Sequence, residues 1–204
     1  RVTAYARPSD LTVALALLAG GGRKVLAGGT DVYPGAGAQL AGDVLDISAL
    51  GALQGITRVD GLRIGACTTW SDLAEADLPP ALAGLQAAAR QVGGRQVQNA
   101  GTIGGNLCNA SPAADGVPPL LTLEAEVELA SARGVRRMPL GAYLRRPRQT
   151  VREADELLLA VLIPERALQG QGRFLKLGAR AHLVISIAMV AVRCCSTARA
   201  CCTT

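Results

Sequence analysis

The chain has 204 residues and a formal net charge of +5, and half of its residues are hydrophobic although only 2% are aromatic. That length suits one domain or two small subdomains, and it allows roughly 70% of the unfolded surface to be buried around an aliphatic core. No secretory segment opens the chain, and its longest apolar run, residues 183–192, is about half of what a membrane helix needs, so we expect a cytoplasmic protein without a membrane segment.

The first part of the chain alternates strand and helix patterns. Residues 2–7 have an extended pattern, and Ser9 can cap a helix over residues 11–19. A short apolar strand is expected at 24–27 and an alternating strand at 43–48. Because parallel strands need a crossover connection, this order predicts a small βαβ subdomain.

The middle of the chain contains patterns typical of antiparallel strands. Asp60-Gly61 between alternating apolar residues is the strongest short-range signal of a hairpin, here over residues 56–66. A helix is expected over 81–92, and strand patterns recur at residues 126–131, 136–140 and 157–163. The fold class predicted is therefore α+β, with a larger antiparallel-sheet subdomain following the small one.

Two more strand patterns, at residues 173–178 and 185–193, precede a cysteine-rich tail. We expect the chain to divide into a small subdomain (1–54), a larger subdomain (55–168) and the start of a truncated third, C-terminal subdomain (169–204). Half a subdomain would leave apolar strand edges unpaired, which is an aggregation risk.

Residues 95–119 stand out as polar and rich in glycine. On composition we expect no helix there, and the stretch is much longer than the usual connection of about 4–6 residues. Glycines permit positive φ or close approach to a ligand, and successive free amides can form an anion-binding concavity. Short polar side chains in this stretch add hydrogen-bonding groups: Thr102, Asn106, Asn109, Ser111 and Asp115.

A second glycine segment, Ala27-Gly28-Gly29-Thr30-Asp31, follows a short apolar strand. The end of a strand in an α/β unit is where ligands bind. Two Gly-Gly segments, each followed by small polar residues, suggest the two halves of one diphosphate cradle. Glycine-rich surface loops without a ligand are the alternative for either segment taken alone.

These segments resemble a known family. Ala27 to Asp31, then Gly101-Thr102-Ile103-Gly104-Gly105-Asn106, then Ser111-Pro112 and Asp115 are similar to the FAD-binding (medium) subunit of molybdenum hydroxylases of the xanthine dehydrogenase and carbon monoxide dehydrogenase type. The resemblance runs from about residue 5 to about residue 193. It implies a two-subdomain FAD-binding fold and an FAD-dependent oxidoreductase subunit.

The resemblance also implies cofactor-binding residues. Backbone groups of Ala27, Gly28, Gly29, Thr30 and Asp31 would contact the pyrophosphate, and Thr102, Ile103, Gly104, Gly105 and Asn106 would hold its other side and the ribityl chain. Asp115 would accept hydrogen bonds from a cofactor hydroxyl, with Asn109 and Ser111 nearby. Leu158, Phe174 and Lys176 would lie near the flavin. A turn residue at Asp115, a core residue at Leu158 and a solvent-facing lysine at Lys176 are the structural alternatives.

In this family FAD carries the redox chemistry, so we expect no catalytic side chain. The resemblance implies two partners, a molybdopterin-binding large subunit and a [2Fe–2S] small subunit, from which electrons pass through FAD to NAD⁺ or another acceptor. A shortened, non-catalytic assembly subunit and a stand-alone flavin oxidoreductase are the alternative functions.

The remaining arginine, cysteine and histidine residues do not indicate a second functional site. A basic run lacks interleaved aromatic residues and a nucleic-acid motif, so we read it as a solvated face or a docking face for an acidic partner: Arg133, Arg136, Arg137, Arg145, Arg146, Arg148 and Arg152. The six cysteines form no C-x-x-C pair, so no metal site is expected, and we expect Cys67 and Cys108 to be buried thiols. The only histidine, His182, is expected to be structural.

Overall fold

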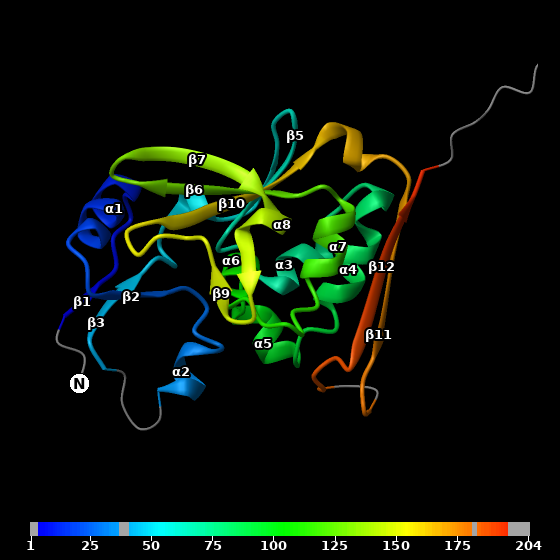
Figure 1. The fold of residues 1–204 in the computed structure, drawn as a ribbon, viewed down its shortest axis with the longest axis horizontal. Helices are drawn as coiled ribbons and strands as arrows, with labels where there is room; N and C mark the ends of the chain where they lie inside the picture. The colour runs from blue at the N-terminus through cyan, green and yellow to red at the C-terminus, as the bar shows by residue number, and fades with distance from the viewer. Residues whose placement is uncertain (1–3, 37–40, 181–182, 196–204) are drawn as a thin grey trace, which may run out of the picture.

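A five-stranded antiparallel sheet is the largest element of the computed structural model, which describes residues 4–36, 41–180 and 183–195 (Figure 1). Its strands lie in the order β4-β5-β10-β6-β7. They are β4 (Ile56–Arg58), β5 (Gly61–Gly65), β6 (Glu126–Ser131), β7 (Gly134–Pro139) and β10 (Leu157–Pro164). The turn between β4 and β5 has φ of 48° at Asp60 and 124° at Gly61, so the predicted Asp-Gly hairpin is confirmed.

A smaller, parallel sheet is formed by the N-terminal segment in the order β1-β3-β2. Its strands are β1 (Tyr5–Ala6), β2 (Arg23–Leu26) and β3 (Asp43–Asp46), and the helix α1 (Leu11–Ala19) connects β1 to β2. The cap of α1 is Asp10 rather than Ser9, because the Asp10 carboxylate accepts a hydrogen bond of 3.0 Å from the Val13 amide. The predicted βαβ arrangement and the α+β class are confirmed.

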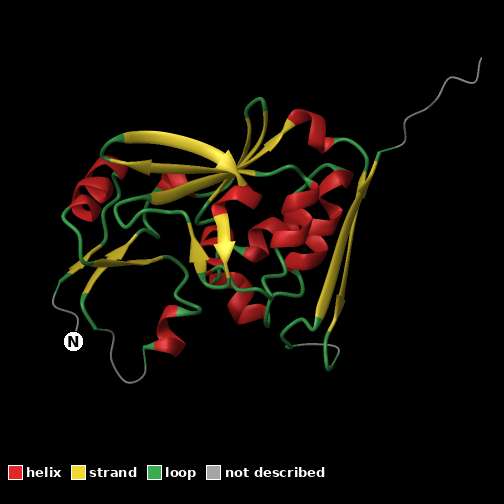
Figure 2. Ribbon diagram, viewed as in Figure 1, coloured by secondary structure: helices red, strands yellow, loops and turns green. Residues whose placement is uncertain are grey.

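Helices pack against one side of the large sheet (Figure 2). They are α3 (Trp70–Glu75), α4 (Ala83–Ala89), α6 (Ile103–Asn109) and α7 (Val117–Thr122), and α5 (Arg95–Ala100) packs on α3. The helix expected over 81–92 is thus shorter, and it is preceded by a 3₁₀ turn, η2 (Pro80–Leu82). Within the described ranges, no helix is both long and apolar enough to cross a bilayer.

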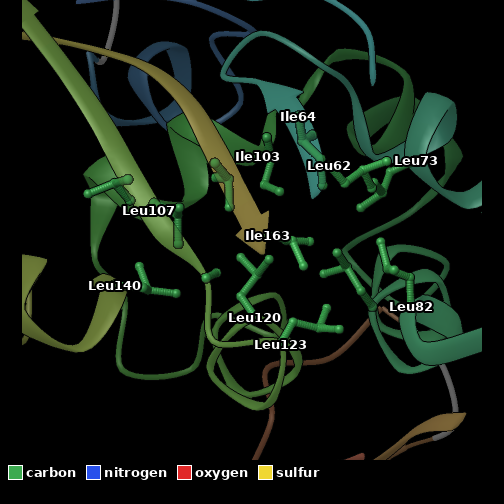
Figure 3. Packing of buried hydrophobic residues seen from close by; sticks show 14 of the residues in the cluster. Leu62, Ile64, Leu73, Leu82, Ile103, Leu107, Leu120, Leu123, Leu140 and Ile163 are labelled. Atoms are coloured by element: carbon green, nitrogen blue, oxygen red, sulfur yellow. The ribbon is translucent and has the colours of Figure 1, made fainter. Parts of the chain in front are cut away.

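The main core lies between the sheet and these helices. Figure 3 shows aliphatic side chains from both layers converging, among them Ile163 of β10, Ile103 of α6 and Leu120 of α7, each at most 1% exposed. Leucine supplies most of the core volume, as the near absence of aromatic residues predicted. Burying each such side chain contributes about 1.5–3 kcal/mol.

The prediction that residues 95–119 contain no helix is wrong, since α5, α6 and the start of α7 lie there. The Thr102 hydroxyl accepts a hydrogen bond of 3.0 Å from the Gly105 amide and so caps α6. Gly104 packs closely against Ala66, because a Cβ at residue 104 would lie 2.6 Å from the Cβ of Ala66. These glycines serve close packing rather than positive φ.

The last described segment is a long ribbon of two antiparallel strands, β11 (Gln171–Leu177) and β12 (Ala188–Cys194), at the right of Figure 1. It packs on α4 and α7. Gly172 allows this approach, since a Cβ there would lie 2.3 Å from the Ala81 carbonyl oxygen. The other face of the ribbon is apolar and open to solvent, with Leu175 77% and Val190 61% exposed.

We propose the division at 54 and 168 because the small parallel sheet, the five-stranded sheet and the ribbon β11–β12 each fall within one of the three units. A second core cluster connects the first two units: Leu18 of α1 and Leu45 of β3 belong to the same buried group as Leu159 of β10. The small sheet is therefore packed against the large one rather than tethered to it.

Candidate functional site

The two glycine segments meet at a cavity of about 800 Å³. A Cβ on Gly28 would lie 1.7 Å from the carbonyl oxygen of Ala100, so the two backbones are in direct contact at a point where no other residue fits. Gly29 has φ of 72°, which turns the chain from β2 into the short helix α2 (Val32–Gly35). The fold therefore joins two segments that are far apart in the sequence into one cavity wall.

Most of the residues singled out from the sequence line this cavity. They are Ala27, Gly28, Gly29, Thr30, Asp31, Thr102, Gly104, Gly105, Asn106, Asn109, Ser111, Asp115, Leu158 and Lys176. Two others do not line it: Ile103 is 1% exposed in the main core, and Phe174 is 6% exposed within β11. The side chains of Ile103 and Phe174 are buried away from the cavity wall.

The backbone amides of residues 28–31 and those of residues 101–106 differ in whether they have a hydrogen-bond acceptor within the protein. Among the described residues, none accepts a hydrogen bond from the amides of Gly28, Gly29, Thr30 or Asp31. In the segment 101–106 the glycine amides are used within the protein: Gly101 donates to Val97 O at 2.6 Å, Gly104 to Ala66 O at 2.8 Å, and Gly105 to Thr102 Oγ1 at 3.0 Å. The expectation of successive free amides is therefore wrong for residues 103–106, whose amides are used within the protein, whereas the amides of residues 28–31 are free to bind an anion.

Two buried polar atoms of cavity-lining residues lack a hydrogen-bond partner in the described part of the chain: Arg23 Nε and Asn106 Oδ1. Other atoms of Arg23 are engaged, since Nη1 donates to the Leu17 carbonyl at 3.4 Å. Leaving a buried polar atom unsatisfied costs about 1–3 kcal/mol, so such atoms are rare in native proteins. Their position at the cavity indicates a polar ligand.

Asp115 and Lys176 form a buried ion pair at the cavity wall. Lys176 Nζ lies 2.5 Å from Asp115 Oδ2, and both side chains are only 7% exposed. Asp115 Oδ1 accepts a second hydrogen bond from the hydroxyl of Ser186. The reading of Lys176 as a solvent-facing strand residue is therefore excluded. Sequence reasoning missed Ser186, because it follows the ribbon turn without any motif.

The arginines of the basic run fall into two groups, one paired with carboxylates and one lining the cavity. Arg133, Arg136 and Arg137 are used in internal ion pairs with carboxylates, whereas Arg148 and Arg152 line the cavity. Arg148 Nη1 donates to Asn109 Oδ1 at 2.5 Å, and Arg152 Nη1 donates to the Glu156 carbonyl at 2.7 Å. Two guanidinium groups thus give this side of the cavity a positive charge suited to an anionic ligand.

Glu156 also lines this cavity, and its carboxylate forms an ion pair with Arg136. It is 3% exposed, and its carboxylate accepts hydrogen bonds from Arg136 Nε at 2.6 Å and Nη2 at 2.8 Å. The Arg136 hydrogen bond, helped by one from the Glu153 amide, outweighs burial and lowers the pKa of Glu156 below its usual value. The carboxylate therefore stays charged across the neutral range.

The cysteines do not form a site in the described residues. Cys67 is buried, as expected, and burial raises the pKa of its thiol to about 12. Cys108 is exposed, against expectation, because it lies on the cavity side of α6, with its sulfur 3.3 Å from the buried Tyr143 hydroxyl. Among described residues no group of three or more His, Cys, Asp and Glu side chains is arranged to hold a metal ion. His182, Cys201 and Cys202 lie outside the described residues.

The chain is similar in sequence to known proteins along most of its length. Residues 1–166 match the family model described as the FAD binding domain in molybdopterin dehydrogenase. The putative xanthine dehydrogenase FAD-binding subunit of Escherichia coli (strain K12) is 37% identical over 178 residues, which cover 82% of this chain and 60% of that protein. The nicotinate dehydrogenase FAD-subunit of Eubacterium barkeri is 37% identical over 149 residues, covering 71% of this chain and 50% of that one.

Solved structures share the fold as well. One is carbon monoxide dehydrogenase from Hydrogenophaga pseudoflava, in a form that lacks the Mo-pyranopterin moiety of its cofactor. It superposes with a TM-score of 0.83 at 28% identity, covering 93% of this chain and 68% of that chain. Quinoline 2-oxidoreductase from Pseudomonas putida 86 gives a TM-score of 0.82 at 25% identity, covering 94% and 67%.

Proposed function

This chain belongs to the family of FAD-binding domains of molybdopterin dehydrogenases, and from that membership we propose that it is the FAD-binding electron-transfer subunit of a molybdenum hydroxylase. The observation that carries the proposal is the cavity of about 800 Å³ between the two glycine segments. Its volume falls within the usual range of cofactor pockets, about 300–1,000 Å³. Free amides and two unpartnered buried polar atoms at its wall fit a polar cofactor.

We assign the cavity residues to the parts of FAD according to the chemistry of their side chains and amides. The amides of residues 28–31 would bind the diphosphate, because free amides at a glycine turn attract anions. Asn109, Ser111 and Asp115 offer donors and acceptors to the ribityl and ribose hydroxyls. Leu158 would offer an apolar surface to the flavin ring, and Lys176, which is paired with Asp115, would place its ammonium group near the ring.

FAD supplies the redox chemistry when bound, and the chain holds it, orients it and excludes water. Electrons would reach the flavin from [2Fe–2S] clusters on a small subunit, after hydroxylation at a molybdopterin-binding large subunit. They would leave to NAD⁺ or another acceptor. A complex of this kind is supported by the relatives, which are named as subunits or medium chains, and we propose that it is cytoplasmic.

The chain spans about 60% of the length of the E. coli subunit that it matches, so retention of FAD is the property to test first. We would record the absorption spectrum of the purified 204-residue chain and identify any flavin released by heat. Flavin bands and released FAD are the expected result. A colourless protein that takes up no added FAD would contradict the proposal and favour a non-catalytic assembly subunit.

The partner assignment needs a separate measurement. Purification of the tagged chain from its native cell should bring with it a large and a small subunit, together with iron and molybdenum in the sample. A flavin-loaded chain without either metal would instead indicate a stand-alone flavin oxidoreductase.

A further inference from the structure

One hydrogen-bonded network joins the ribbon β11–β12 to the loop that follows α6. Asp115 lies in that loop, Lys176 lies near the end of β11, and Ser186 lies just before β12. Lys176 Nζ contacts Asp115 Oδ2 at 2.5 Å, and the Ser186 hydroxyl donates to Oδ1 of the same carboxylate. Each carboxylate oxygen is therefore held from a different point of the ribbon.

The same arrangement completes the cavity. The ribbon turn contributes Leu183, Val184 and Ile185 to the cavity lining, directly before Ser186 in the chain. Leu183 has φ of 52°, which directs the chain back toward the cavity, and a Cβ on Gly94 would lie 2.9 Å from its side chain. Residues 183–185 of this connection are thus part of the wall of the pocket.

We infer that Ser186 is a positioning residue for the flavin, which fixes the Asp115 carboxylate in the orientation that a cofactor hydroxyl meets. This rests on the proposed function, in which Asp115 accepts a hydrogen bond from the cofactor. A carboxylate has two oxygens with about four acceptor sites. Lys176 and Ser186 occupy one site on each oxygen, which leaves one directed acceptor on each for a ligand.

Lys176 alone would not fix this orientation. The terminal torsion of an aspartate is broad, so a single ion pair leaves the carboxylate plane free to turn. The Ser186 hydroxyl removes that freedom by binding the second oxygen. A hydrogen bond to a charged group changes an equilibrium by about 10- to 100-fold, so we expect Ser186→Ala to weaken FAD binding by about tenfold.

Loss of the Ser186 hydroxyl should not unfold the ribbon. The ribbon end is held by backbone contacts, since the Ile187 amide donates to the Leu177 carbonyl at 2.8 Å. Seven residue pairs of β11 and β12 remain in register from Gln171↔Cys194 to Leu177↔Ala188. An effect on FAD binding can therefore be separated from an effect on folding.

The test is an FAD titration of the full 204-residue chain, followed by flavin fluorescence and by the visible absorption bands of the bound flavin. The variants are Ser186→Ala, Ser186→Thr, Asp115→Asn and the double variant Ser186→Ala/Asp115→Asn. The matched control is Ile187→Ala, whose side chain is 69% exposed in the same turn. Thermal unfolding of each apoprotein reports on folding.

We expect Ser186→Ala to bind FAD about tenfold more weakly with altered flavin bands, Ser186→Thr to restore both, and Ile187→Ala to match the wild type. In the Asp115→Asn background, Ser186→Ala should weaken FAD binding little further, because Ser186 acts through the same carboxylate. Unchanged FAD binding in Ser186→Ala would overturn this inference and leave the proposed function intact. Losses of FAD affinity that are fully additive in the double variant would do the same. A wild-type chain that binds no FAD would overturn the proposed function and this inference with it.

Discussion

Gly28 illustrates how a single residue shapes the site by having no side chain. Its α-carbon lies against the backbone of Ala100, so the segment 27–31 can approach the segment 100–106 this closely only if residue 28 has no side chain. Gly28 and Gly29 line the cavity, and among the described residues none accepts a hydrogen bond from their amides. A neighbour made of backbone cannot move aside as a flexible side chain does.

We therefore predict that Gly28→Ala separates the two segments and weakens FAD binding by at least about tenfold, with about 1–3 kcal/mol lost from the free energy of unfolding. Gly35→Ala is the control, since a Cβ at Gly35 meets nothing within 4 Å. Titration with FAD and urea unfolding check both effects. Equal affinity in the two variants would show that the contact does not shape the site.

A second residue-scale prediction concerns Glu156. Its pKa is lowered in the folded state by the hydrogen bonds from Arg136, so it contributes stability above its unfolded pKa of about 4.3, and this stability is lost as the pH falls through the folded pKa. Glu156→Gln should cost about 2 kcal/mol at pH 7 and much less at pH 3.

Urea unfolding at pH 7 and pH 3 measures this difference. The control Glu165→Gln removes an exposed pair with Arg58, whose side chain is 62% exposed, and should cost less than about 1 kcal/mol at pH 7. If the wild type and Glu156→Gln differ equally at both pH values, the carboxylate is not the source of the stability.

At the scale of the element, α6 depends on its cap. The helix is short and contains Gly104 and Gly105, each of which weakens a helix by about 1 kcal/mol relative to alanine. The Thr102 hydroxyl compensates by accepting a hydrogen bond from the Gly105 amide. Tertiary contacts supply the rest, through the close packing of Gly104 on Ala66.

We expect Thr102→Val to lower the free energy of unfolding by about 1 kcal/mol, because it removes the capping oxygen and keeps the shape, whereas Thr102→Ser should retain it. Denaturant unfolding followed by circular dichroism distinguishes them. A loss of the same size in Thr102→Ser would assign the effect to the methyl group rather than to the cap.

At the scale of the whole molecule, the exposed face of the ribbon dominates behaviour in solution. Leu175 and Val190 are directly opposite each other on adjacent strands, and both are more than half exposed. Leu177 and Ile187 extend the same apolar surface at 61% and 69% exposure. Contiguous exposed apolar surface on a sheet promotes association.

The purified chain should therefore self-associate at high concentration, and the double variant Leu175→Lys/Val190→Lys should shift it toward the monomer. Light scattering coupled to size-exclusion chromatography measures this. The control is the double variant Val13→Lys/Val59→Lys, which introduces the same charge at two residues outside the ribbon that are 50% and 65% exposed. Identical profiles for the ribbon variant and the control would contradict a role of the ribbon face.

Local periodicity and glycine motifs were enough to predict the fold class, the Asp60-Gly61 hairpin and the βαβ start. Fourteen of the sixteen residues expected to bind the cofactor line the cavity, and the resemblance to a known family supplied those that no glycine motif marks. Only the tertiary structure decided the rest. It made α6 helical despite its glycines, because packing on Ala66 outweighs intrinsic propensity. It also brought Ser186 to Asp115, a contact between residues far apart in the chain that no local pattern specifies.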